Sequence, residues 1–486
     1  MTKFQRNIIA WQFCAAVMPV FAQPQPPPTS VANQIVAGAA KATTTAIPLP
    51  APSASARELF SKYKDRLVQV RVLLNSANEQ SSLGSGFVVR NDAGGIWLVT
   101  NYHVVSSLAI DPAKFRIELR PTSEKTVKAT LMAVDVIHDL AVLRADPAPD
   151  LKAWPAFALR DNALTQGERI FAMGNPLELG FLISEGIYNG PVESRIYEQM
   201  LFSGALNAGM SGGPTIDETG RAVGVNVATH RMGQLLSFLV PIRYARELLD
   251  RALATPAAAK KEWRSEIGRQ LLIHQKFVAG KLLTSSSPTS SATAQTGKPF
   301  TTDTDVSGAV VGAKLGFASQ QFSGRTVPTL DGSLTRCWAG GRDGERLKYQ
   351  RDSLQCKLQS EVFVRNQFYT GSLRIQHVLL RNDKLATPQF LSLDASSRVA
   401  SYFFQNGNRE MTRNECHDDY VRGTQHVYRI AICLQAFRKF EGIYDMTVSA
   451  VQVDDARERL SSTLTLRGFS FDNAEAISGK FLERLQ

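Results

Sequence analysis

A serine between glycines is the first feature of this sequence that could do chemistry. Ser211 lies in the stretch 207–214, which reads NAGMSGGP. The small residues after it would let a substrate backbone approach the hydroxyl, and Gly209 permits a tight turn that aims backbone N–H groups at one point. Such a point would be an oxyanion hole. Because glycine-serine loops are also common as plain turns, the interpretation depends on partners for this serine.

Two partners lie upstream. A serine hydroxyl becomes a nucleophile when an imidazole takes its proton and a carboxylate orients that imidazole. The stretch 99–105 (VTNYHVV) supplies His103, directly after an apolar run. The stretch 138–143 (HDLAVL) supplies Asp139, at the head of a run that is typical of a buried strand. The order along the chain is therefore His, Asp, Ser.

These residues and their flanks resemble the trypsin-like serine proteases and, among them, the HtrA/Deg group of bacterial and organellar proteases. The resemblance covers roughly residues 57–255, in the blocks GSGFVV (84–89), VTNYHVV (99–105), DLAVL (139–143), GNP (174–176) and GMSGGP (209–214). It implies a double β-barrel with His103 as general base, Asp139 as its orienting carboxylate and Ser211 as nucleophile. It also implies an oxyanion hole made by the backbone N–H groups of Gly209 and Ser211.

The resemblance further implies a primary specificity pocket, walled by residues just before the nucleophile and by the strand after it. Those residues are Ala205, Leu206, Asn207, Asn226, Val227 and Ala228. None is acidic, so a Lys or Arg side chain would be left without a countercharge. We therefore expect cleavage after small or medium apolar residues such as Val, Ala or Leu.

The N-terminal residues predict export. Residues 1–22 begin with Lys3 and Arg6, continue through an apolar stretch and end in VFA. This pattern favours a secretory signal peptide, and the stretch is too short and too broken for a retained membrane anchor. No later stretch is long and apolar enough to span a bilayer, which predicts a periplasmic or secreted protein. Residues 23–56, rich in Pro, Ala, Ser and Thr, are expected to form a flexible tether.

The charge is spread thinly. The formal net charge is +11, but residues 57–255 contain 21 Lys and Arg against 21 Asp and Glu. Without a concentrated basic face, nucleic acid is not expected as a partner. The expected partners are protein or peptide substrates, with no metal and no organic cofactor. The Gly-Leu-Gly loop of the HtrA peptide-binding module is not visible, so that family's oligomeric state is not carried over.

Short strands dominate the pattern between residues 84 and 240. A short helix is expected over 57–66, a first strand over 67–73, and hairpin turns at 92–95 and 217–220. The pattern alone predicts an all-β sandwich or barrel. Apolar residues at helical spacing then predict a helix over 242–254 that closes the protease domain, 57–255.

The rest of the chain differs in character. Within 256–283 we expect an amphipathic packing helix over 260–283, with Trp263, Ile267, Leu271, His274 and Val278 near one face. Residues 284–299, rich in Ser and Thr, read as a linker. Residues 300–486 predict a second β-rich (α+β) domain that resembles no family. Its expected elements are strands at 362–364, 372–380, 427–433 and 444–453 and a final helix over 473–485.

Cysteine usage agrees with an oxidising compartment. Cys14 would leave with the signal peptide, and the remaining four lie in the C-terminal region: Cys337, Cys356, Cys416 and Cys433. Four cysteines allow three pairings, of which the local ones, Cys337 with Cys356 and Cys416 with Cys433, close the shortest loops. A zinc site that uses them with His417 or His426 is the alternative. The lack of a Cys-x-x-Cys spacing disfavours it.

Other histidines have weaker cases for chemistry. His138 abuts Asp139, but adjacent strand residues point to opposite faces, so it is expected to be a packing residue. His230 is expected at an exposed strand end rather than in the cleft. His377, His417 and His426 have no partner that the sequence identifies.

Two functions follow. The first is an exported serine endopeptidase that works through an acyl-enzyme, in envelope protein quality control or processing. The rival is a protease-like fold that only binds, as a chaperone or envelope adaptor, with the C-terminal region carrying the main role. The complete His-Asp-Ser set favours the enzyme.

Overall fold

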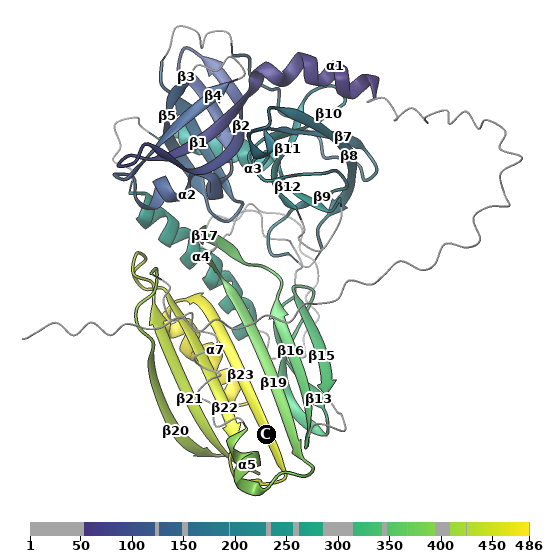
Figure 1. Cartoon of the computed structure of the whole chain (residues 1–486), viewed down its shortest axis with the longest axis vertical. Helices are drawn as coiled ribbons and strands as arrows, with labels where there is room; N and C mark the ends of the chain where they lie inside the picture. Colours follow the sequence, from purple (N-terminus) through teal and green to yellow (C-terminus); the bar gives the residue numbers. More distant parts are fainter. Residues whose placement is uncertain are drawn as a thin grey trace, which may run out of the picture. The chain divides into compact units, whose positions relative to one another are not determined.

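Two closed six-stranded barrels follow one another along the first half of the chain (Figure 1). The computed structural model describes residues 53–121, 126–147, 154–193, 195–229, 235–255, 262–284, 314–342, 348–366, 368–393, 409–423 and 425–485. The predicted signal peptide, nearly all of the tether, nearly all of the linker and His230 lie outside these residues.

The first barrel has the strand order β1-β2-β3-β6-β5-β4. Every second residue of its first strand is apolar and points inward, and Val68, Val70 and Val72 are at most 1% exposed within one hydrophobic cluster. That alternation is what a strand with one face on a core requires. Its strands are β1 (Leu67–Leu74), β2 (Glu79–Asp92), β3 (Gly95–Thr100), β4 (Phe115–Pro121), β5 (Val127–Asp135) and β6 (Leu140–Ala145).

The second barrel has the strand order β10-β11-β12-β9-β8-β7. A second hydrophobic cluster joins residues of both barrels, Phe87 and Val99 with Phe171 and Met173, so the two barrels share a core between them. Its strands are β7 (Arg169–Gly174), β8 (Leu182–Pro191), β9 (Met200–Phe202), β10 (Pro214–Asp217), β11 (Ala222–Thr229) and β12 (Ser237–Pro241). The predicted double β-barrel is thereby confirmed.

Helices border the barrels much as the apolar spacing predicts. The predicted N-terminal helix is α1 (Ala54–Tyr63), followed by a 3-10 turn, and the closing helix is α3 (Ile242–Ala254) with the predicted bounds. Helix α4 (Trp263–Thr284) buries Ile267, Leu271, His274 and Val278, whereas Trp263, which was predicted on the same face, is only half-buried. None of the helices that the structure describes is long and apolar enough to cross a bilayer.

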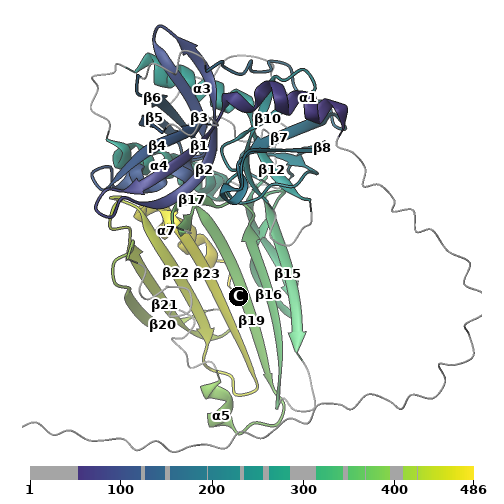
Figure 2. The ribbon, with the colours of Figure 1, turned by 45° about the horizontal axis from the view of Figure 1, so that its top comes forward.

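The C-terminal region is built on a seven-stranded antiparallel sheet of order β15-β16-β19-β23-β22-β21-β20 (Figure 2). These strands are β15 (Thr335–Arg342), β16 (Tyr349–Leu358), β19 (Ser372–Asn382), β20 (Glu415–Arg422), β21 (Val427–Ala436), β22 (Tyr444–Gln452) and β23 (Glu458–Phe469). The described residues of this region also form two hairpins, β13 (Gly316–Phe322) with β14 (Arg325–Asp331) and β17 (Val362–Arg365) with β18 (Phe368–Thr370), and the helices α5 (Thr387–Ser392) and α7 (Phe471–Leu482). The apolar side chains of α7 pack in one cluster with those of the sheet and of the second half of α4.

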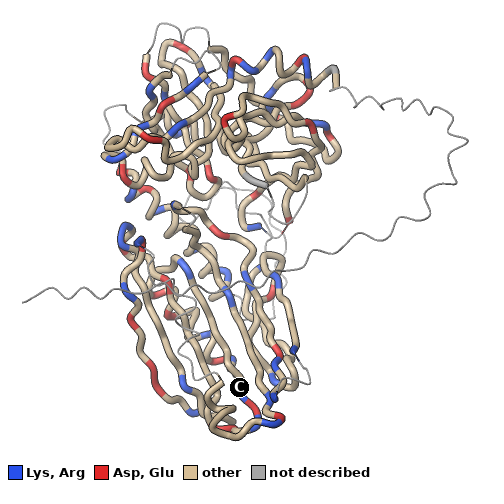
Figure 3. Tube along the Cα trace, in the orientation of Figure 1, with Lys and Arg blue, Asp and Glu red and all other residues tan. Residues whose placement is uncertain are grey.

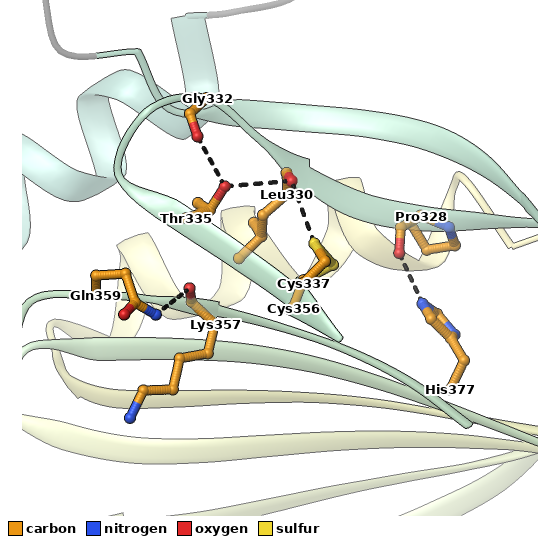
Figure 4. The surroundings of a disulfide bond; sticks show 9 residues. All are labelled: Pro328, Leu330, Gly332, Thr335, Cys337, Cys356, Lys357, Gln359 and His377. Carbon is orange, nitrogen blue, oxygen red and sulfur yellow. Dashed lines mark hydrogen bonds between the residues drawn. A yellow bond between two sulfur atoms is a disulfide. The ribbon is translucent and has the colours of Figure 1, made fainter. Parts of the chain in front are cut away.

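Both predicted disulfides are present. Cys337 pairs with Cys356 across β15 and β16 (Figure 4). Cys416 pairs with Cys433 across β20 and β21. The bonds therefore attach each edge strand of the sheet to its inner neighbour.

Lys and Arg are interspersed with Asp and Glu along the described trace (Figure 3). The described residues form one compact unit.

Candidate active site

His103 and Asp139 are brought together by the start of a helix and the start of a strand. Helix α2 (Tyr102–Ile110) begins directly after β3, which places His103 in its first turn. Asp139 precedes β6 with φ = 57°, a left-handed backbone that Asp tolerates better than most residues. The Asp139 carbonyl accepts hydrogen bonds from the Tyr102 N–H at 3.0 Å and from Asn101 Nδ2 at 2.8 Å. These two bonds fix the start of α2 to the segment before β6, independently of any contact between the side chains of His103 and Asp139.

The carboxylate of Asp139 holds the histidine at two points. Oδ1 accepts the His103 backbone N–H at 2.8 Å, and Oδ2 lies 2.6 Å from His103 Nδ1. Burial disfavours the charged imidazolium, but the nearby negative charge of Asp139 and its hydrogen bond outweigh burial and raise the pKa of His103. A proton on Nδ1 leaves Nε2 as the free acceptor, which is the state that a general base needs.

Ser211 reaches this region from the second barrel. It lies in the loop between β9 and β10, and its Oγ donates a hydrogen bond to the Val227 carbonyl of β11 at 2.7 Å. Among the described residues no hydrogen bond joins Ser211 Oγ to His103. For His103 to take a proton from Ser211, this hydroxyl would first have to leave the Val227 carbonyl by rotation about the Cα–Cβ bond of Ser211.

The loop before Ser211 leaves two N–H groups available. It contains two successive turns, in which Met210 N–H donates to Asn207 O and Gly213 N–H donates to Met210 O, each at 3.0 Å. The N–H groups of Gly209 and Ser211 donate to no residue in the described part of the chain. Gly209 has φ = 96°, which only glycine adopts readily. These are the two groups that were predicted to form the oxyanion hole.

Ser85 is a site residue that the sequence reasoning missed. Its Oγ donates to the Gly209 carbonyl at 2.7 Å and accepts the Asn175 N–H at 2.9 Å, while its own N–H donates to the Ser211 carbonyl at 2.7 Å. Ser85 of the first barrel thereby fixes the nucleophile loop of the second. The GSG block at 84–86 pointed to this residue, but not to its role.

Gly212 and Gly213, which follow Ser211, are required for a different reason from the one that we expected. We expected them to admit a substrate backbone. A Cβ on Gly212 would instead lie 2.3 Å from the Ser85 carbonyl oxygen, and one on Gly213 would lie 2.1 Å from the Met173 carbonyl oxygen. Glycine is required here because the backbone of the loop packs directly against neighbouring backbone.

The predicted pocket residues divide into two groups. Ala205 and Asn207 are exposed and Val227 is half-buried, whereas Leu206 is 5% exposed and packs in the core of the second barrel. Asn226 is fully buried. Its Nδ2 donates to the carbonyls of Met173 and Met210, and its Oδ1 accepts from Thr215 Oγ1. The Asn226 amide therefore stabilises the barrel and the nucleophile loop, and the side chain of Ala228 lies outside the described residues.

The remaining described histidines have structural partners or lie at the surface. His138 is buried as predicted, with Nδ1 2.9 Å from Asp135 Oδ2 and its ring stacked on Tyr244. His377 lies between Ser462 Oγ and the Pro328 carbonyl, and His426 is bonded to Gln452. His417 is exposed on β20. Within the described residues no group of three His, Cys, Asp or Glu side chains could hold a metal ion.

Comparisons with known proteins agree with this geometry. The family model described as "Trypsin-like peptidase domain" matches residues 84–225. Serine protease HTRA2, mitochondrial, of Bos taurus is 31% identical over 212 residues, which are 42% of this chain and 41% of that protein. The probable periplasmic serine endoprotease DegP-like of Brucella suis is 31% identical over 206 residues, which are 41% of this chain and 37% of that protein.

The crystal structure of the serine endoprotease from Yersinia pestis matches 42% of this chain and 67% of its own, with 21% identity and a TM-score of 0.34. The chain spans about two fifths of the length of the curated relatives it matches. Residues 84–225 belong to the trypsin-like peptidase domain family, and their relatives include HtrA and DegP serine proteases.

Proposed function

We propose that this chain is a serine endopeptidase in which Ser211, His103 and Asp139 form the catalytic triad. The observation that carries the proposal is the 2.6 Å bond from His103 Nδ1 to Asp139 Oδ2, beside a serine loop with two unused N–H groups. An imidazole oriented by a carboxylate, a serine between glycines and two free donors are the parts that acyl transfer requires.

The reaction begins when Ser211 Oγ attacks the peptide carbonyl carbon and its proton passes to His103 Nε2. Negative charge then develops on the carbonyl oxygen, where the N–H groups of Gly209 and Ser211 stabilise it. His103 returns the proton to the leaving amine as the C–N bond breaks. Water, deprotonated by His103, next attacks the acyl-enzyme and releases the carboxylic acid product.

The substrates that we propose are proteins cleaved after small or medium apolar residues. Ala205, Asn207 and Val227 supply no negative charge to bind a Lys or Arg side chain. Digestion of a peptide library should show Val, Ala or Leu before the cleaved bond. A dominant Arg or Lys preference would contradict this specificity.

We further propose an envelope location and a role in protein quality control or processing. The predicted signal peptide, the two disulfides and the similarity to a probable periplasmic DegP-like endoprotease support it. One observation favours the rival function, which is binding without hydrolysis. Ser211 Oγ is engaged by the Val227 carbonyl rather than by His103.

A fluorophosphonate probe separates the two functions, because it reacts only with an activated serine hydroxyl. The full-length protein should be labelled, and peptide mapping should place the label on Ser211. Ser203→Ala is the matched control, since Ser203 lies in the same barrel and, within the described part of the chain, its hydroxyl bonds to the backbone of Ile187 alone. Ser203→Ala should be labelled and Ser211→Ala should not. A folded protein without label, or with label elsewhere, would favour the binding function.

A further inference from the structure

The imidazole of His103 has an aromatic neighbour from the C-terminal region. Phe363 of β17 lies with its ring centroid 6.0 Å from that of His103, at an interplanar angle of 77°. Edge-to-face contacts at such distances are attractive and directional. Tyr369, the residue paired with Phe363 on β18, makes a second edge-to-face contact with the Phe363 ring, with centroids 5.4 Å apart.

The strand that carries Phe363 is fixed on the helix that carries His103. Val362 and Val364, on the opposite face of β17, are 3% and 1% exposed and belong to the same hydrophobic cluster as the α2 residues Val104 and Ile110. The buried Tyr102 hydroxyl donates a hydrogen bond to the Val364 carbonyl at 2.9 Å. Phe363 is only partly buried: it packs against the edge of this cluster, with its ring centroid 6.3 Å from that of Tyr102, and it also contacts the imidazole of His103.

A second attachment lies at the other end of α2. Asp111, the residue after the helix, pairs with Arg365 of β17 at 2.5 Å, with Lys439 at 2.8 Å and with Arg264 of α4 at 2.7 Å. Burial opposes the ionised form of Asp111, but the hydrogen bonds and charges of Lys439 and Arg365 lower its pKa to about 2. Charged partners of this kind, partly buried, fix a geometry more firmly than exposed pairs do.

From these contacts we propose that Phe363 is a positioning residue for His103. Asp139 holds the imidazole at Nδ1. Phe363 limits rotation of the imidazole ring away from the orientation in which Nε2 faces Ser211. The side chain of His103 is 29% exposed, so without this ring it would have open space to move into. This inference rests on the proposed function and extends it, because it makes the C-terminal region part of the machinery that orients the base.

The first test compares kinetic constants of full-length variants. Phe363→Ala should lower kcat about tenfold and leave KM within about twofold, because a lost aromatic contact changes the population of the productive imidazole rather than substrate binding. Phe363→Leu keeps most of the buried volume and should show a smaller loss of kcat with unchanged folding. Phe471→Ala is the matched control, since Phe471 makes the same edge-to-face contact, at 6.3 Å and 77°, with Tyr444.

Phe471→Ala should keep wild-type kcat. Wild-type kcat in folded Phe363→Ala and Phe363→Leu, or an equal loss in Phe471→Ala, would overturn the inference.

The second test needs no activity. In full-length Ser211→Ala, the proton between His103 Nδ1 and Asp139 should give a downfield NMR signal, assigned by its loss in Ser211→Ala/Asp139→Asn.

In Ser211→Ala/Phe363→Leu that signal should broaden, because a freely moving ring exchanges its proton with water faster. An unchanged sharp signal would overturn the positioning role. Failure of the proposed function would look different. Either the wild-type protein would then hydrolyse no substrate, or Ser211→Ala would retain wild-type hydrolysis, whatever the NMR signal does.

Discussion

Two His-Asp pairs of similar geometry have different environments in this molecule. In the pair of His103 and Asp139 the side chains are 29% and 18% exposed, whereas in the pair of His138 and Asp135 they are 3% and 10% exposed. The second pair is further covered by Tyr244 and bound by Arg251. The first is open to a substrate, and the second is part of the core.

This contrast predicts opposite effects of the same substitution. Asp139→Asn should lower kcat/KM by about 10⁴, because an amide cannot hold the imidazole in the required tautomer or stabilise its charge. Asp135→Asn should leave kcat/KM within a few-fold but lower the free energy of unfolding by roughly 3 kcal/mol, since it removes the buried carboxylate that is hydrogen-bonded to His138 and paired with Arg251. Kinetic assays and denaturant titrations of both variants check this. The reverse pattern would mean that the two roles are interchanged.

The pH dependence of activity should follow the protonation of the His103 imidazole. Because Asp139 raises the pKa of His103 against the effect of burial, the imidazole stays protonated to a higher pH than an ordinary histidine. Activity should be full at high pH and lost as pH falls through that pKa, which lies above the usual value of about 6.5. A profile of kcat/KM against pH measures it. In Asp139→Asn the residual activity should show this limb at lower pH, and a limb that does not move would contradict the assignment.

At the scale of elements, sequence patterns predicted the helices and turns that depend mainly on neighbouring residues. Helix α3, the turn between β2 and β3 and the turn between β10 and β11 lie where apolar spacing and turn residues indicated. The sequence reasoning missed seven strands of the C-terminal region, β23 among them, which reads LSSTLTL over 460–466 and is buried on both faces. Its Ser and Thr residues hide the apolar alternation on which strand prediction depends.

The roles of Ser85 and Phe363 were missed for another reason. Ser85 bonds to Gly209, 124 positions away, and Val364, next to Phe363, bonds to Tyr102 across 262 positions. Such pairings depend on how whole elements pack, which local periodicity does not contain. The three residues that we propose as the triad could be named from the sequence because each lies in a recognisable block.

Ser85→Ala tests the link between the barrels. Loss of its hydroxyl leaves the Gly209 carbonyl and the Asn175 N–H without this partner, which should loosen the loop whose Gly209 and Ser211 N–H groups form the proposed oxyanion hole. We expect kcat to fall roughly 10- to 100-fold with little change in KM. Ser81→Ala, an exposed serine on the same strand, is the control and should behave as wild type. Equal kinetics in both variants would show that Ser85 has no part in catalysis.

At the scale of the molecule, the C-terminal region contributes to the same core as the first barrel. One hydrophobic cluster contains Leu98 of β3, Ile110 of α2, Ile267 of α4, Val364 of β17 and Phe440. Helix α4 continues from this cluster into that of the seven-stranded sheet, where its residues Val278 and Leu282 pack. The region beyond residue 300 is therefore integrated with the barrels rather than merely appended to them.

The disulfides should stabilise the sheet at both of its edges. Each closes a short loop, with 19 and 17 positions between its cysteines, for which chain entropy gives about 3 kcal/mol. Reduction should lower the temperature of the calorimetric transition that includes the C-terminal sheet. Four free thiols under non-reducing conditions, or a transition that reduction does not shift, would contradict the pairing or its contribution.

The most direct measurement is the rate at which purified Ser211→Ala degrades casein. If Ser211 is the nucleophile of a triad with His103 and Asp139, the folded variant should lose about four to six orders of magnitude in rate. Adding His103→Ala to it should cost little more, because the machinery is already broken. Folded Ser211→Ala that degrades casein at the wild-type rate would contradict the assignment of the nucleophile, and with it the proposed peptidase.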